Sequence, residues 1–141
     1  MAQVLAARGS RALVFRGDDG LDELTTATTS SVWVVRDGEV EPDRVDPSAL
    51  GIPASDAQAL RGGSPAVNAE VFRRVMDGER GPVRDAVLLN AAAALAAFDE
   101  RAERLHDALA SGLERAAAAV DDGRAAATLE RWVTVSRALR V

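Results

Sequence analysis

Residues 12–25 read ALVFRGDDGLDELT, an apolar run that leads directly into an acidic turn. The run from Ala12 to Phe15 is short, is bounded by Gly17 and is typical of a buried strand. Two glycines let the following backbone turn sharply, and this turn carries four carboxylates within six residues, at Asp18, Asp19, Asp22 and Glu23. Because open α/β sheets bind ligands beyond the carboxyl ends of their strands, we expect an α/β protein with a binding site at this loop.

The four carboxylates admit two interpretations. Clustered carboxylates repel one another unless a cation neutralises them, and their hard oxygen atoms suit Mg²⁺, which keeps several waters and bridges to substrate phosphates. The alternative is a solvated acidic turn in which Asp side chains accept hydrogen bonds from nearby backbone N–H groups. The spacing alone leaves both interpretations open.

Downstream of the loop the sequence predicts a β-hairpin. Residues 32–36 form an apolar second strand, Asp37-Gly38 is a signal for a two-residue turn, and residues 39–41 return. Pro42 confines that return strand to the edge of a sheet. A hairpin and one further strand do not make a satisfied sheet, so we expect residues 12–15 to take parallel partners from elsewhere.

The rest of the chain is predicted to be helical. A first helix at residues 1–7 ends at Gly9, and two short helices follow the hairpin, one starting at Asp46-Pro47 and one capped by Ser55 with Gln58. Longer helices are predicted to start at Ser64-Pro65, at Pro82, near Leu105 and before Leu129. With no repeat and no linker, residues 1–141 are expected to form a single domain.

Composition limits the possible partners. All 17 basic residues are Arg, the formal net charge is −5 and there is no Cys. An acidic chain is repelled by nucleic acid and by anionic membranes, so we expect neither as a partner. The most apolar stretch, residues 83–98, is shorter than the ~20 residues of a membrane span and is expected to be a buried helix. The lack of Cys allows a reducing compartment, and we expect a cytoplasmic location.

Residues 14–25 resemble the G-x-D-G-L-D-E signature of the anthranilate phosphoribosyltransferase family. Other segments match that family in the same order: residues 1–5, 32–40 (V-W-x-V-x-D-G-E-V), 46–51 (D-P-x-x-L-G), 61–69 (R-G-G-x-x-x-x-N-A), 85–95 (D-x-x-x-L-N-A-A-A-A-L) and 129–132. The resemblance implies the C-terminal part of a catalytic domain of the phosphoribosyltransferase and nucleoside phosphorylase fold. Such a part has a few strands, including one hairpin, followed by a helical tail.

The resemblance also implies a reaction of tryptophan biosynthesis. A phosphoribosyl group moves from phosphoribosyl pyrophosphate to the amine of anthranilate, and pyrophosphate leaves with charge that a divalent cation can stabilise. In the family the Asp-Glu pair of this loop serves a Mg²⁺ ion, which carries over to Asp22 and Glu23. Asp18 and Asp19 are then expected to orient the metal site. Arg16, where the family usually has His, is a further candidate beside it.

Several family motifs are not in this sequence: the glycine-rich G-T-G-G-D loop, the K-H-G segment, the anthranilate-binding Arg and the N-terminal helical domain. In the family order they belong upstream of Met1. We therefore expect the chain alone to be inactive, and to self-associate or to need a partner chain that covers the open sheet edge. One alternative is a non-catalytic homologue that acts as an interaction module. Another is a pyrimidine nucleoside phosphorylase, against which D-G-L-D-E-L-T at residues 19–25 argues.

Four other side chains have predicted roles. Asn90 is the one uncharged polar residue in the helix at residues 83–98 and is expected to make a satisfied internal hydrogen bond. His106 is expected at the surface. Trp33 and Trp132 are expected to pack in the core and at its edge.

Overall fold

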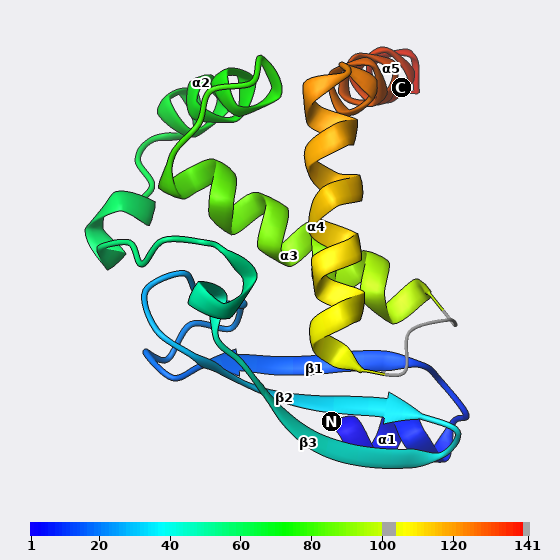
Figure 1. Ribbon diagram of the computed structural model, residues 1–141. Coiled ribbons are helices and arrows are strands. Elements are labelled where there is room, and N and C mark those ends of the chain that lie inside the picture. Colours follow the sequence, from blue (N-terminus) through cyan, green and yellow to red (C-terminus); the bar gives the residue numbers. More distant parts are fainter. Residues whose placement is uncertain (100–103, 140–141) are drawn as a thin grey trace.

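A computed structural model describes residues 1–99 and 104–139 of the chain. One helix, α1 (Ala2–Ala7), precedes a sheet of three strands, β1 (Ala12–Gly17), β2 (Ser30–Arg36) and β3 (Glu39–Val45). The sheet is followed by η1 (Pro47–Leu50), η2 (Ala57–Leu60), α2 (Pro65–Met76), α3 (Pro82–Phe98), α4 (Leu105–Asp121) and α5 (Arg124–Ala138). The expected order of a strand, an acidic loop, a hairpin and a helical tail is confirmed (Figure 1).

The sheet is antiparallel, with strand order β1-β2-β3. β1 pairs with β2 along its whole length, from Ala12 opposite Val35 to Gly17 opposite Ser30. This pairing uses one edge of β1, and the expectation of parallel partners from elsewhere on its other edge stays a prediction. The long acidic loop between the two strands reverses the chain, which the hairpin signals of the sequence did not reveal. Since β1 lies at the edge of this sheet, its apolar residues are half-buried and not fully buried.

The predicted hairpin joins β2 to β3. Asp37 and Gly38 both have positive φ, 52° and 81°, as a tight hairpin turn requires. β3 extends through Pro42 to Val45, farther than predicted. It does so because β3 is the other edge of the sheet, where a proline interrupts no second ladder of hydrogen bonds.

The helical tail begins close to where it was predicted. Asp46 caps η1 and Gly51 ends it in the left-handed conformation, with φ 76°, and Ser64 caps α2. The capping box at Ser55 was wrong. Asp56 accepts the hydrogen bond from the Gln58 N–H group at the start of η2, and the Ser55 hydroxyl bonds that of Thr26 at 2.7 Å.

α3 and α4 cross over one face of the sheet and form most of the core (Figure 1). Leu89 and Leu109, both less than 2% exposed, pack with Val32 from the sheet. Side chains alternate between faces along a strand, so Trp33 points to the opposite face, on which α1 packs. Trp33 is 38% exposed, which corrects the prediction that it packs in the core.

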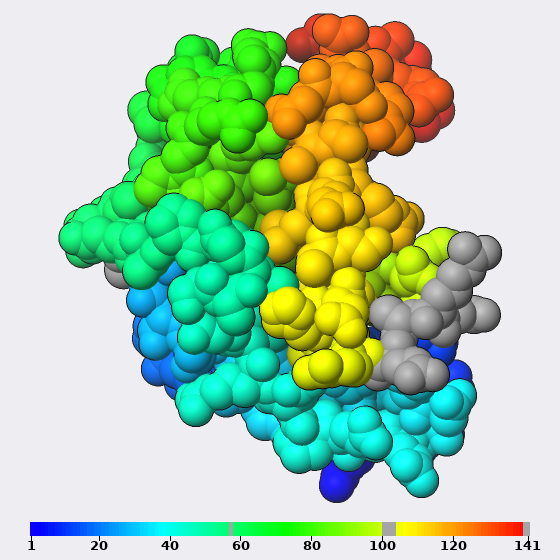
Figure 2. All heavy atoms as spheres, viewed as in Figure 1, coloured from blue at the N-terminus to red at the C-terminus, as the bar shows by residue number. Residues whose placement is uncertain are grey.

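α5 lies at the end of α4 that is far from the sheet (Figures 1 and 2). None of its residues is buried, and Trp132 is 71% exposed, so the predicted packing of Trp132 at the core edge was also wrong. His106 is exposed, as expected. Among the described residues no helix is long and apolar enough to cross a membrane.

Candidate functional site

The acidic loop between β1 and β2 is anchored to helix α3 through Asn90. The Leu24 N–H group donates to Asn90 Oδ1 at 3.0 Å, and Asn90 Nδ2 donates to the carbonyl oxygens of Leu24 at 2.9 Å and Ala86 at 3.0 Å. The predicted internal hydrogen bond of Asn90 is confirmed, and its function is to hold the loop. Because Leu24 is 2% exposed, the residue next to Glu23 has a fixed position against the helix.

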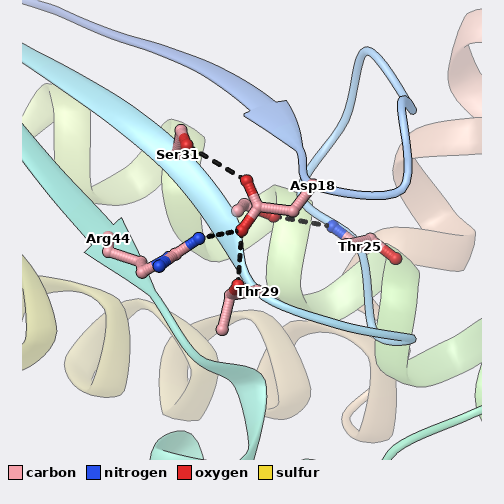
Figure 3. A network of polar contacts seen from close by, with 6 residues as sticks. Asp18, Thr25, Thr29, Ser31 and Arg44 are labelled. Atoms are coloured by element: carbon pink, nitrogen blue, oxygen red, sulfur yellow. Dashed lines mark hydrogen bonds and ion pairs between the residues drawn. The ribbon is translucent and has the colours of Figure 1, made fainter.

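Asp18 lies in a network of polar contacts with three other side chains (Figure 3). Its carboxylate accepts hydrogen bonds from the hydroxyls of Thr29 and Ser31 and forms an ion pair with Arg44 of β3. The bond from Thr29, together with that from Arg44, holds the pKa of Asp18 below its usual value. With both carboxylate oxygens engaged, Asp18 ties the start of the loop to β2 and β3.

Asp19 closes the loop upon itself. Its Oδ1 accepts from the Leu21 N–H group at 3.2 Å, and its Oδ2 accepts from the Thr25 hydroxyl at 2.7 Å. Gly17 makes this turn possible, since a Cβ atom there would lie 2.4 Å from Asp19 Oδ1. Asp19 thus behaves as the solvated-turn interpretation predicted, because it accepts from a backbone N–H group, whereas the Asp18 oxygens accept from side chains.

Asp22 and Glu23 behave differently from the first two carboxylates. Both are exposed, and neither makes a hydrogen bond or an ion pair with any residue that the structure describes. Arg16 is exposed as well, and its Nη2 atom lies 3.9 Å from where a Cβ would stand on Gly20. The guanidinium of Arg16 therefore lies beside the acidic turn, and its own hydrogen-bonding groups have no partner among the described residues.

The donor set that the loop offers to a metal is two carboxylates. Residues 1–99 and 104–139 contain no group of three or more His, Cys, Asp or Glu side chains that could hold a metal ion. Mg²⁺ is commonly held by one or two carboxylates together with waters and substrate phosphates. The free oxygens of Asp22 and Glu23 fit that pattern, whereas Asp18 and Asp19 have no free oxygen to turn toward them.

Three elements of the site were not recognised in the sequence. The Thr/Ser-rich segment after the loop supplies the hydroxyls that hold it, Arg44 pairs with Asp18, and Glu23 lines a groove bordered by η2, α2 and the start of α3. The run of Thr and Ser at residues 25–31 was the available signal, because such side chains bond locally to loop backbone. Arg44 and the groove depend on residues far apart in sequence.

Comparison with known proteins places this fold and loop in a class. Residues 1–126 match the model of the glycosyl transferase family, a/b domain, and the chain belongs to that family. Within it the chain is similar to anthranilate phosphoribosyltransferases. It is 59% identical to that of Acidothermus cellulolyticus over 141 residues, and 59% identical to that of Thermobifida fusca over 138 residues. These matches cover 99% and 98% of this chain but 40% of each relative.

Solved structures agree with the sequence relatives. The anthranilate phosphoribosyltransferase of Thermus thermophilus superposes with a TM-score of 0.78 at 34% identity, covering 96% of this chain and 39% of that one. The enzyme of Saccharomyces cerevisiae in complex with 4-fluoroanthranilate gives a TM-score of 0.83 at 21% identity, with 93% and 37% covered. The second comparison shows the shared fold alone. The chain thus spans about 40% of the length of its curated relatives.

Proposed function

We propose that this chain carries the metal-binding half of an anthranilate phosphoribosyltransferase. Substrates, metal and reaction all belong to this proposal, as do a single domain over residues 1–141 and a cytoplasmic location. The observation that carries it is that the carboxylates of the acidic loop differ in their contacts. Asp18, Asp19 and Asn90 hold the loop in place, and the adjacent Asp22 and Glu23 are left exposed with free oxygens.

Asp22 and Glu23 are the residues that would hold Mg²⁺. When bound with the phosphoribosyl donor, the ion neutralises charge that develops on the departing pyrophosphate. One structure of the Saccharomyces cerevisiae enzyme is described as a complex with PRPP and Mg, which supports the choice of ion. The contribution of this chain is to present two carboxylates from a backbone fixed at Leu24. Arg16, beside the same turn, adds a positive charge that can face a phosphate oxygen.

The chain by itself is proposed to be inactive and to bind Mg²⁺ weakly. Its 141 residues contain no G-T-G-G-D loop, and positioning of the reactants supplies on the order of 7–11 kcal/mol in such reactions. Mg²⁺ loses its water ligands reluctantly, so two carboxylates without substrate phosphates are expected to bind it weakly. Product formed above a protein-free blank by the pure chain with Mg²⁺, or a sub-micromolar Mg²⁺ affinity by calorimetry, would contradict this part.

A chimera tests the proposed function. The part of the Acidothermus cellulolyticus relative that precedes the matched region is joined to this chain, and formation of phosphoribosyl-anthranilate is followed with Mg²⁺ present. We expect turnover in the parent chimera. We expect a loss of about 100-fold in kcat in its Asp22→Asn variant, because that variant removes electrostatic stabilisation used in the transition state.

The matched control is Glu39→Gln, which neutralises an exposed carboxylate at the start of β3 and is expected to keep kcat within about twofold, as surface changes usually do. If the chimera folds with a cooperative thermal transition and forms no product, the transferase function is overturned for this chain. That result would favour the non-catalytic homologue.

A further inference from the structure

A groove of about 710 Å³ lies between η2, α2 and the start of α3. Four arginines line it, Arg61, Arg74, Arg80 and Arg84, whereas Glu23 and Glu79 are its only acidic lining residues among those described. The groove therefore has a net positive charge in a chain whose formal net charge is −5. A concave surface that concentrates one sign of charge attracts ligands of the opposite sign.

The four arginines are not equally available to a ligand. Arg74 pairs with Glu79 at 3.1 Å, and Arg84 is 3% exposed and pairs with Asp121 at 2.7 Å. Arg61 and Arg80 are exposed, and their side chains make no hydrogen bond or ion pair with any described residue. Two arginines whose side chains have no other partner among the described residues thus line one groove, from the end of η2 and from the turn before α3.

Arg84 also lines the groove, and its Nη1 atom is buried without a hydrogen-bond partner among the described residues. Its charge is balanced by Asp121, as that of Arg74 is by Glu79. The net positive charge of the groove lining therefore comes from Arg61 and Arg80, set against Glu23.

Apart from Asn68, the remaining side chains that line the groove are apolar. Phe72 and Val67 are 44% and 53% exposed, and both line the groove with Leu60, Val71 and Val87. Small-molecule sites are mostly apolar concavities of ~300–1,000 Å³ with a few polar groups that fix orientation. Phosphate accepts paired hydrogen bonds from guanidinium groups. We infer that this groove binds an organic phosphate, whose phosphate lies at Arg61 and Arg80 and whose ring or apolar body lies against Phe72.

This inference does not rest on the proposed transferase reaction. Binding at Arg61 and Arg80 needs no metal, whereas phosphate binding at Asp22 and Glu23 would need Mg²⁺. Titration of the 141-residue chain with phenyl phosphate in the presence of a chelator, at about physiological salt, separates the two sites. Binding is followed by calorimetry and by the ³¹P chemical shift of the ligand.

We expect metal-independent binding of phenyl phosphate, weakened about tenfold or more in Arg61→Ala/Arg80→Ala because two charge-assisted contacts are lost. Phe72→Ala should weaken the binding of phenyl phosphate but leave the affinity for inorganic phosphate unchanged. The control is Arg73→Ala: Arg73 is an exposed arginine of α2 that pairs with Glu70 and does not line the groove. The affinity of Arg73→Ala for phenyl phosphate should stay within twofold of that of the parent chain.

The inference is overturned if phenyl phosphate does not bind at millimolar concentration, or if Arg61→Ala/Arg80→Ala binds it as tightly as Arg73→Ala does. Circular dichroism checks that each variant is folded. Should the double variant unfold, the single variants Arg61→Gln and Arg80→Gln replace it and must each show a loss greater than that of Arg73→Ala. Binding that appears only with Mg²⁺ and disappears in Asp22→Asn assigns the phosphate to the metal site and also rejects the groove.

Discussion

At the scale of single residues, two asparagines make the same contact in different surroundings. Asn90 accepts from the N–H group and donates to the carbonyl of Leu24, and Asn68 does the same to Gly63. Leu24 is buried, whereas Asn68 and Gly63 are exposed. A backbone group that loses its partner away from water keeps its full desolvation penalty, whereas water replaces the partner at the surface.

The first prediction compares these two residues. Asn90→Ala is expected to lower the free energy of unfolding by about 2–3 kcal/mol, because two buried backbone groups of Leu24 lose their partner. Asn68→Ala is expected to lower it by less than about 1 kcal/mol. Urea unfolding at equilibrium measures both changes. Equal losses in the two variants would contradict the assignment of Asn90 as the anchor of the acidic loop.

The second prediction concerns the acid sensitivity that Asp18 confers. Hydrogen bonds from Thr29, then from Arg44, lower the pKa of Asp18 in the folded protein relative to the unfolded chain. A lowered folded pKa gives stability that is complete above the unfolded pKa, near 4, and is lost as pH falls through the folded value. Asp18→Asn should therefore reduce stability at pH 7 and flatten the fall in stability below about pH 4.

The matched control for this measurement is Glu41→Gln. Glu41 is an exposed carboxylate on β3, the strand that also carries Arg44, and its side chain makes no hydrogen bond or ion pair with the described residues. Thermal unfolding of the three proteins between about pH 3 and pH 7 gives the comparison. A pH dependence that is the same in Asp18→Asn and in the parent would show that the Asp18 network does not stabilise the loop.

At the scale of elements, α3 and α4 approach closely where Gly112 faces Ala92. A Cβ atom on Gly112 would lie 2.7 Å from the Ala92 carbonyl oxygen and 2.9 Å from its Cα atom. Both are backbone atoms of a helix, which cannot move aside as the end of a flexible side chain can. The crossing of these two helices over the sheet therefore requires a residue without a side chain at this position.

The third prediction sets two opposite effects against each other. Gly112→Ala should gain about 1 kcal/mol in helix propensity, but the steric overlap pushes α3 and α4 apart at a cost of about 1–3 kcal/mol or more. Because the overlap is with backbone, we expect a net loss of about 1–2 kcal/mol in thermal unfolding. Ser111→Ala, at the exposed neighbouring position, should be close to neutral. A more stable Gly112→Ala variant would mean that the helices are farther apart than described.

At the scale of the whole molecule, the described residues leave the two outer edges of the sheet and an apolar part of α5 without a partner. β1 pairs only with β2, so its other edge presents unpaired N–H and C=O groups. Trp132 and Val135 of α5 are 71% and 50% exposed, and Leu139 at its C-terminal cap is 74% exposed. Open strand edges are templates for pairing with another chain, and exposed apolar patches favour association.

The fourth prediction is that the 141-residue chain associates in solution. We expect light scattering at tens of micromolar to give a mass above that of one chain, 14.8 kDa, and an apolar dye to bind. A clean monomer with cooperative unfolding and no dye binding would contradict this prediction. Trp132→Glu serves as a diagnostic variant, because it should lower the associated fraction if α5 takes part and leave it unchanged if only the edge of β1 does.

Local sequence signals were sufficient wherever the physical cause is local. Pro82 and Ser64 start helices, Asp37-Gly38 turns the hairpin, and Asn90 is satisfied, because each depends on backbone geometry or on one buried polar group. The acidic loop was located for the same reason. The local signals failed at the start of η2, where Ser55 was predicted as the cap and the adjacent Asp56 is the cap. The Ser55 hydroxyl instead bonds Thr26, a residue far away in the sequence.

By itself, the sequence determined the family of this protein, the order of its elements and the position of the acidic loop. Only the tertiary structure decided which carboxylates of that loop are free. Asp18 and Asp19 are used by Thr, Ser and Arg side chains within the protein, and Asp22 and Glu23 are not. The antiparallel pairing of β1 and the arginine-lined groove were likewise decided only by the tertiary structure. The physical reason is the same in each case: these features depend on contacts between residues far apart in the chain, which neither periodicity nor spacing records.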